Sequence, residues 1–288
     1  MIQVHAPGKI VLLGEYAVVD GAPAIVAAVD RGVRCVASPA PTLTIDAPDD
    51  RFVGPALHDA TGSYRFTAWN PPSTPTKAGL GSSAAATVAA VVARRAIEDL
   101  PHEPAAVQAT ATPIHRAVQG SGSGIDVAAS CHGGVLRFTL DETRPLPADD
   151  LADRLSVVWS GRSADTGRRV ERYRALADRR WFTDASAAIV DGWTTDPIWA
   201  FAAASALLHE LDRRADLGWW IPEYTPILAR AADHGGAAKP SGAGGGDVVV
   251  AVFPDRAHRD AFERACPADQ PLGVRLAGPA TPHSPDGA

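Results

Sequence analysis

Cysteine is scarce in this sequence, and the few cysteines stand far apart. There are three in 288 residues, Cys35, Cys131 and Cys266, and no CxxC pair occurs. An odd number of separated cysteines argues against a structural metal cluster and suits a protein whose thiols stay reduced. A cytoplasmic protein is therefore predicted.

Excess positive charge and long apolar runs are also missing. Lys and Arg number 27 against 33 Asp and Glu, so the formal net charge is −6. No block of like charges occurs, and we expect no nucleic-acid partner. No stretch approaches ~18 apolar residues, and the run Ile10–Leu13 is too short for the core of a signal peptide. We expect no membrane partner either.

Several familiar catalytic signatures are absent. The chain has no GxxxxGK[ST] loop, and Gly120, Gly122 and Gly124 fail the spacing of GxGxxG. It has neither a GxSxG elbow nor an HExxH pair, so hydrolase interpretations are disfavoured. The triplet His258–Asp260 reads HRD, but it lacks the other protein-kinase signatures and lies in an amphipathic helix pattern.

Lysine is the rarest basic residue, and its positions are informative. The three lysines are Lys9, Lys77 and Lys239, each within or beside a glycine-containing segment, and every other basic residue is arginine. A lysine ammonium is a compact charge that suits a phosphate oxygen, whereas the planar arginine fork does not fit as tightly. The chain also has a single asparagine, Asn70, which can form a turn or read a nucleotide base.

The segment TKAGLGSSAAATVAA places glycines directly before an Ala/Val-rich helix that is predicted to begin at Ser82. Glycines let the backbone approach a ligand closely. The first amides of a helix are unpaired and lie at its positive end, so this junction predicts an anion site that fits phosphate. Ser82 and Ser83 can cap the helix, contact phosphate or hold Mg²⁺. A buried helix with a glycine-rich entry loop is the simpler alternative.

The coarse order of elements predicts an α+β protein in two lobes. Short strands are expected at 10–13, 24–29, 33–37 and 42–45, and helices at 82–97 and 104–118. The polar, proline-bearing stretch 141–150 is a candidate linker, so we expect domains at 1–150 and 151–288. A second group of strands follows it, with helices expected at 168–177, 198–215, 222–234 and 256–266. The tail from Ala277 is expected to be disordered.

Three segments together resemble the three motifs of the GHMP kinase superfamily, in the same order. They are APGKIVLLGEY, TKAGLGSSAA and KPSGAGGGD, and the resemblance spans Pro7 to Asp247. With GEYAVVDG and GSGIDVAAS, they are most similar to the phosphomevalonate kinase family. The segment WSGRSADT is similar to that family's TGxPAST segment, from which Ser163 and Asp165 depart.

The resemblance implies a two-lobed fold with the active site between the lobes. The N-terminal lobe, 1–150, would be ribosomal protein S5 domain 2-like and bind ATP, and the C-terminal lobe, 151–288, would be ferredoxin-like. The cofactors implied are ATP and Mg²⁺.

The resemblance also implies roles for individual residues. The catalytic residues would be Asp126, Lys9 and Lys77, although Asp126 is equally readable as an acid that stabilises a helix N-terminus. ATP would be bound by Asn70, Gly79, Leu80, Gly81, Ser82, Ser83 and Ala84, and the metal by Ser83 and Glu15. The acceptor would be bound by Lys9, Tyr16, Ser123, Gly124, Ser160, Gly161 and Gly244.

The acceptor is expected to be a small phosphorylated molecule. A phosphomonoester is already largely ionised near neutral pH, because its second pKa is about 6, so it needs cations more than a base. Lys9 and Lys77 would supply them, with Arg116 or Arg162. The expected reaction converts phosphomevalonate to diphosphomevalonate. Mevalonate, sugar or homoserine kinases, a diphosphomevalonate decarboxylase and a non-catalytic nucleotide-binding regulator stay open as alternatives, as does a homodimer.

Overall fold

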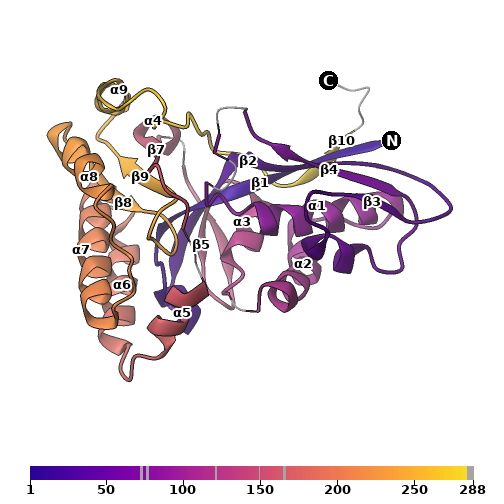
Figure 1. Ribbon diagram of the computed structural model, residues 1–288, viewed down its shortest axis with the longest axis horizontal. Coiled ribbons are helices and arrows are strands. Elements are labelled where there is room, and N and C mark those ends of the chain that lie inside the picture. Colours follow the sequence, from indigo (N-terminus) through magenta and orange to yellow (C-terminus); the bar gives the residue numbers. More distant parts are fainter. Residues whose placement is uncertain (72–73, 76–77, 121, 149, 165–166, 284–288) are drawn as a thin grey trace.

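The chain forms two β-sheets, each packed against its own helices (Figure 1). The computed structural model describes residues 1–283 apart from 72–73, 76–77, 121, 149 and 165–166. The larger sheet is built almost wholly from the first half of the chain, and the smaller from the second half. The α+β class expected from the sequence is confirmed.

The larger sheet has the strand order β10-β1-β2-β4-β3, with β5 beside β2 and β6 beside β5. Its pairs are antiparallel except for β3 and β4, which are parallel. The strands are β1 (Ile2–Leu13), β2 (Ala24–Ser38), β3 (Thr44–Asp46), β4 (Ser63–Trp69), β5 (Val135–Phe138), β6 (Thr143–Leu146) and β10 (Thr281–His283).

Three helices lie side by side beneath this sheet in Figure 1: α1 (Ser82–Ile97), α2 (Pro104–Gln119) and α3 (Ile125–His132). The small Ala and Val side chains of α1 let it pack closely on β1 and β2, and most of them are fully buried. Because buried helices hold their ends firmly, the residues just before α1 and α3 have fixed positions. Three short 3-10 helices complete this half: η1 (Ala17–Asp20), η2 (Asp50–Phe52) and η3 (Gly54–Leu57).

The smaller sheet has the antiparallel order β7-β9-β8. Its central strand, β9, has the sequence VVVAV and is buried throughout, as expected for a strand covered on both faces. The strands are β7 (Leu155–Trp159), β8 (Ala237–Pro240) and β9 (Val248–Val252). The helices are α4 (Leu151–Arg154), α5 (Gly167–Arg174), α6 (Arg180–Gly192), α7 (Pro197–Ala215), α8 (Tyr224–Asp233) and α9 (Arg256–Ala265).

The end of the chain departs from the sequence-based expectation. The tail from Ala277 was expected to be disordered, but the Ala277 amide donates to the Ala28 carbonyl at 3.0 Å, and β10 pairs with β1. Backbone hydrogen bonds along the edge of β1 hold this segment, and composition does not report such pairing. The division into domains at residue 150 stays a prediction. None of the described helices has the length and apolarity that a membrane span requires.

Candidate active site

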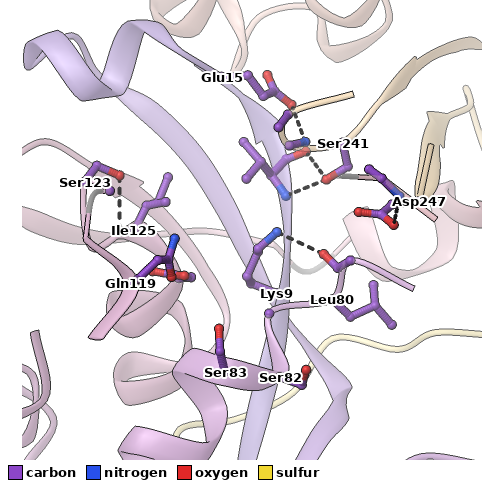
Figure 2. Close-up of a pocket in the computed structure, with 18 of the residues that line it drawn as sticks. Lys9, Glu15, Leu80, Ser82, Ser83, Gln119, Ser123, Ile125, Ser241 and Asp247 are labelled. Carbon is purple, nitrogen blue, oxygen red and sulfur yellow. Dashed lines mark hydrogen bonds between the residues drawn. The ribbon is translucent and has the colours of Figure 1, made fainter. Parts of the chain in front are cut away.

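A cavity of about 420 Å³ brings together residues from all three motif-like segments. Figure 2 shows Lys9 near its centre, with Leu80 and Asp247 on one side and Gln119 and Ser123 on the other. The lining comes from β1 and η1, the loop before α1, the facing ends of α2 and α3, and the loop between β8 and β9. Segments more than 200 residues apart in the chain therefore share one site.

The loop Gly79–Gly81, which we call the phosphate loop, lies directly on Lys9. The Lys9 amide donates to the Leu80 carbonyl at 2.7 Å, and its Nζ donates to the Gly79 carbonyl at 3.1 Å. Gly79 and Gly81 have φ of 72° and 79°, values that favour glycine. A Cβ at residue 81 would lie 2.9 Å from Lys9 Cγ. Both glycines are thus needed for this close approach.

The N-terminus of α1 opens into the cavity with its amides uncovered by a side-chain cap. Gly81 is the N-cap, so neither Ser82 nor Ser83 caps the helix. Both serines line the cavity, and the Ser83 hydroxyl lies 3.2 Å from His115 Nε2. Ala84 is fully buried and does not line the cavity. The junction keeps the unpaired amides and positive dipole end expected of an anion site.

Asp126 stands in the first turn of α3, after Gly124 in the left-handed conformation. Its Oδ1 accepts a hydrogen bond from the Val127 amide at 3.0 Å, and its side chain lines the cavity with those of Ser123 and Lys9. Within the described structure no ion pair joins Asp126 to Lys9, which bonds to the phosphate loop instead. A carboxylate and an ammonium therefore face one cavity separately.

Glu15 and Lys239 form a buried ion pair, with side chains 2% and 0% exposed. Glu15 Oε1 also accepts from the Gly242 amide at 3.4 Å. Burial lowers the pKa of Lys239, and the charge of Glu15 opposes that shift. Lys239 does not line the cavity, so we assign the contact with phosphate to Lys9 and Lys77 only. Glu15 also lines the cavity, and its predicted role at the metal stays a prediction.

The other predicted acceptor residues divide into two groups. Tyr16 and Ser123 line the cavity, and the Tyr16 hydroxyl donates to the Ala243 carbonyl at 2.7 Å. Burial raises the pKa of Tyr16, so this phenol stays protonated. Ser160, Gly161 and Gly244 do not line the cavity. The Ser160 hydroxyl turns back to the Arg162 carbonyl at 3.1 Å, and a Cβ at residue 244 would overlap the Trp219 ring.

The sequence also singled out Asn70, Lys77 and Asp165. Asn70 lines the cavity, and its Oδ1 accepts from the Gly32 amide at 3.1 Å, a contact between neighbouring strands and not a local turn. Its side-chain amide nitrogen makes no hydrogen bond within the described structure. Lys77 and Asp165 lie outside the described residues.

Sequence reasoning named Arg116 but missed the other polar residues on the same face of α2. Thr112, His115, Arg116 and Gln119 follow the i, i+3, i+4, i+7 spacing of one helical face, and all four line the cavity. Arg116 adds a positive charge there, whereas Arg162 does not line the cavity. Because the helix itself was predicted, the spacing of these four residues along one face could have been recognised in the sequence. What the sequence did not show is that this face meets Ser83 across the cavity.

Comparisons with known proteins agree with this arrangement. Residues 70–134 match the family model of the GHMP kinases N terminal domain, and residues 199–271 match that of the GHMP kinases C terminal domain. The chain is 30% identical to a phosphomevalonate kinase of Streptomyces sp. (strain CL190), over 89% of this chain and 91% of that protein. It is 31% identical to a mevalonate kinase of Methanothermobacter thermautotrophicus, over 86% of this chain and 89% of that protein.

Solved structures show the same fold. A phosphomevalonate kinase of Streptococcus pneumoniae in complex with phosphomevalonate and AMPPNP superposes with a TM-score of 0.73 at 18% identity, covering 98% of this chain and 99% of that one. A Lin0012 protein from Listeria innocua reaches a TM-score of 0.79 at 22% identity, covering 98% of both chains.

Proposed function

This chain belongs to the GHMP kinases, and from that premise we propose that it transfers the terminal phosphoryl group of ATP to phosphomevalonate, giving diphosphomevalonate. The observation that carries the proposal is the single cavity in which the phosphate loop, the open N-terminus of α1, Lys9 and Asp126 meet. Phosphoryl transfer depends mainly on positioning and on charge neutralisation, and these groups supply both. The relative of 30% identity supports the choice of acceptor.

We assign the nucleotide to the phosphate-loop end of the cavity. The uncapped amides at the start of α1 and the glycines of the loop offer hydrogen-bond donors to phosphate oxygens. Lys9 lies on the loop and neutralises charge on the transferred group. We assign Asn70, which lines the cavity, to the base or the ribose. Lys77 keeps its predicted role as a second cation.

A magnesium ion fits this site only together with the nucleotide. No group of three or more His, Cys, Asp or Glu side chains that could hold a metal occurs among the described residues. Mg²⁺ commonly takes one or two protein oxygens and completes its shell with phosphate and water. Ser83 Oγ is the protein ligand that we propose, with Asp126 facing the same space. The ion would neutralise charge on the phosphates.

The acceptor end of the cavity suits a small molecule that has two anionic groups and a short aliphatic chain. Arg116 and Lys9 supply positive charge, while Val18, Val19 and Ile125 supply apolar surface. Asp126 then orients the incoming phosphate and the neighbouring cations, because an ionised phosphate needs no base. This role differs from that of a general base for a hydroxyl acceptor.

A mevalonate kinase is the second candidate. The relative of 31% identity favours it, and so does Asp126, because a carboxylate in the cavity can accept a hydroxyl proton. The two candidates share ATP and the phosphate loop and differ only in the acceptor.

A panel of acceptors separates these candidates. The purified protein with Mg-ATP is incubated with phosphomevalonate, mevalonate, homoserine or galactose, and ADP release is measured. We expect turnover with phosphomevalonate and little with the others. Turnover of mevalonate with none of phosphomevalonate would replace the proposed acceptor, and no binding of ATP by calorimetry would overturn the kinase proposal itself.

A further inference from the structure

Asp247 ends the third motif-like segment and has an unusual backbone. Its φ is 59°, in the left-handed region that favours glycine, and it directly follows three glycines. The described chain has four other non-glycine residues of this kind, and three of them, Asp59, Asp99 and Asp216, are exposed. Asp247 instead is half-buried and lines the cavity. Glycine adopts this backbone conformation with less strain than aspartate, so an aspartate at this position indicates a function for its side chain.

Three hydrogen bonds join Asp247 to the loop of residues 160–164, which we call the acceptor loop. The Ser160 amide donates to the Asp247 carbonyl at 3.0 Å, and the Asp247 amide donates to the Arg162 carbonyl at 2.6 Å. The Ala164 amide donates to Asp247 Oδ1 at 2.9 Å. Only the last of these needs the side chain, and Ala164 is the residue of this loop that lines the cavity.

The other carboxylate oxygen faces the phosphate loop. A Cβ at residue 79 would overlap Asp247 Oδ2, so the Gly79 backbone packs directly against the carboxylate. Figure 2 shows Asp247 on the same side of the cavity as Leu80, beyond Lys9. Burial raises the pKa of Asp247, while the Ala164 amide and the charges of Lys9 and Arg169 favour its ionised form.

We propose that Asp247 is a positioning residue, which holds the acceptor loop at a set distance from the phosphate loop and so sets where the acceptor binds relative to ATP. The inference rests on the proposed function, because that function assigns the phosphate loop to ATP; the acceptor loop enters the same cavity through Ala164. The phosphate loop also has two hydrogen bonds to Lys9, which do not depend on Asp247. Loss of the carboxylate therefore acts mainly on the acceptor loop.

The test is steady-state kinetics of Asp247→Ala, Asp247→Gly and Asp247→Asn, with ATP and acceptor varied separately. A hydrogen bond to a charged group is removed in the Ala and Gly variants, so their KM for the acceptor should rise by about 10- to 100-fold. Their KM for ATP should stay within ~3-fold, since that loop keeps its other bonds. Asn keeps an oxygen acceptor and tolerates this φ, so Asp247→Asn should stay within ~3-fold for both substrates.

Thermal unfolding separates positioning from simple stability. Glycine suits φ 59°, so Asp247→Gly should melt at or above the temperature of Asp247→Ala, yet both should share the same defect in acceptor KM. The matched control is Asp99→Ala, another left-handed aspartate (φ 54°), which is exposed and lines no part of the cavity; its KM values should be unchanged.

Three results would overturn the inference: an unchanged acceptor KM in Asp247→Ala, an equal rise in the KM for ATP, or an acceptor defect in Asp247→Asn as large as in Asp247→Ala. The wild-type acceptor panel decides the proposed function by itself. If the wild-type protein uses mevalonate instead, the same variants are tested with mevalonate, so the two failures are distinguishable.

Discussion

At the scale of single residues, the rare lysines have different tasks in the folded protein. Lys9 reaches the phosphate loop, whereas Lys239 is fully buried against Glu15 and 5.7 Å above the Phe201 ring. A buried ion pair is compensated only while both charges are present. The Lys239 side chain therefore stabilises the loops around the cavity without lining the cavity itself.

Removing one member of this pair should destabilise the protein strongly. Lys239→Met leaves the Glu15 carboxylate buried without its counter-charge, and we expect the free energy of unfolding to fall by about 3–5 kcal/mol. Denaturant unfolding measures this. The double variant Glu15→Gln/Lys239→Met should recover much of the loss, because no uncompensated charge remains. If the single variant is as stable as the wild type, the ion pair does not contribute to the free energy of unfolding as proposed.

Asp126 allows a test of which acceptor chemistry the site performs. If the acceptor is a hydroxyl, Asp126→Asn removes a general base, and kcat should fall by ~10²–10⁴-fold. If the acceptor is phosphomevalonate, the variant loses only the orientation of charge, and the loss should be milder. Pre-steady-state measurement of ADP formation reports the chemical step directly. A loss of ~10²-fold or more with phosphomevalonate would contradict the assigned role.

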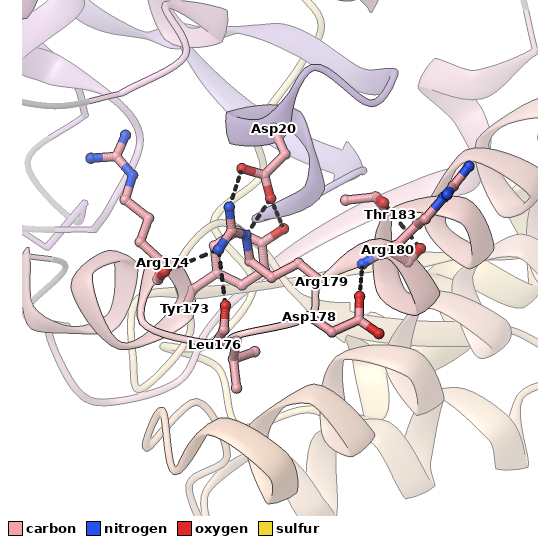
Figure 3. A network of polar contacts seen from close by, with 8 residues as sticks. All are labelled: Asp20, Tyr173, Arg174, Leu176, Asp178, Arg179, Arg180 and Thr183. Carbon is pink, nitrogen blue, oxygen red and sulfur yellow. Dashed lines mark hydrogen bonds and ion pairs between the residues drawn. The ribbon is translucent and has the colours of Figure 1, made fainter.

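At the scale of elements, a polar network fastens the first half of the chain to the helices of the second. Figure 3 shows Asp20, at the end of η1, facing Arg179 and Tyr173. Arg179 donates to both carboxylate oxygens, at 2.7 and 3.2 Å, and the Tyr173 hydroxyl donates at 2.7 Å. The Tyr173 ring lies 5.4 Å from that of Tyr16, which lines the cavity. The network therefore holds α5 against η1, and both elements contribute residues to the cavity.

The pH dependence of stability should reveal this network. Burial alone would raise the pKa of Asp20, but hydrogen bonds from Arg179 and Tyr173 outweigh it and hold the pKa below its usual value. A lowered folded-state pKa stabilises the protein above the unfolded-state pKa of about 3.9, and that contribution disappears as the pH falls through the folded-state value. Asp20→Asn should thus melt several degrees lower than wild type at neutral pH, with the gap closing in acid.

Differential scanning calorimetry between about pH 7 and pH 3 spans the unfolded-state pKa and measures this gap. The matched control is Asp184→Asn, because Asp184 pairs with Arg180 at 3.8 Å with both side chains largely exposed. An exposed pair contributes about 0–1 kcal/mol, so that variant should melt close to wild type. A gap for Asp20→Asn that is independent of pH would contradict the ionic origin of its effect.

At the scale of the whole molecule, the cavity is where the two sheets with their helices meet. Lys9 comes from the larger sheet, and Ser241 and Asp247 come from the loop between two strands of the smaller one. The Ser241 hydroxyl bonds to both the amide and the carbonyl of Val11, at 2.9 and 3.0 Å, across that boundary. A ligand in the cavity therefore contacts both halves of the fold.

Nucleotide binding should consequently stabilise the whole chain. At a ligand concentration of 100 times Kd, binding to the folded state adds about 2.7 kcal/mol, which corresponds to a rise in Tm of roughly 4–5 °C for a chain of this size. Thermal unfolding with and without Mg-ADP measures it, and Gly81→Ala serves as the negative variant because its Cβ would press on Lys9. A wild-type Tm that does not respond to nucleotide would argue against the proposed ATP site.

The sequence by itself determined the local features. It predicted the helix 82–97, which matches α1 from Ser82 to Ile97, because the Ala/Val run and the preceding glycines act within a few residues of one another. The GHMP family likewise followed from the three lysine–glycine segments. The helix α6 was missed although its buried positions, Phe182, Ser186, Ile189 and Val190, follow a helical spacing.

Only the tertiary structure decided which of these residues meet. The strands expected at 24–29 and 33–37 form one long strand, because β1 pairs with both of them. Arg31, between them, donates to the carbonyls of Leu272 and Gly273. Lys239 pairs with Glu15, and the Ala164 amide bonds to Asp247. These partners are separated by 83 to 242 positions. Such contacts leave no periodic signal in the sequence. They depend on how the sheets and helices pack, and on which charged groups are desolvated by that packing.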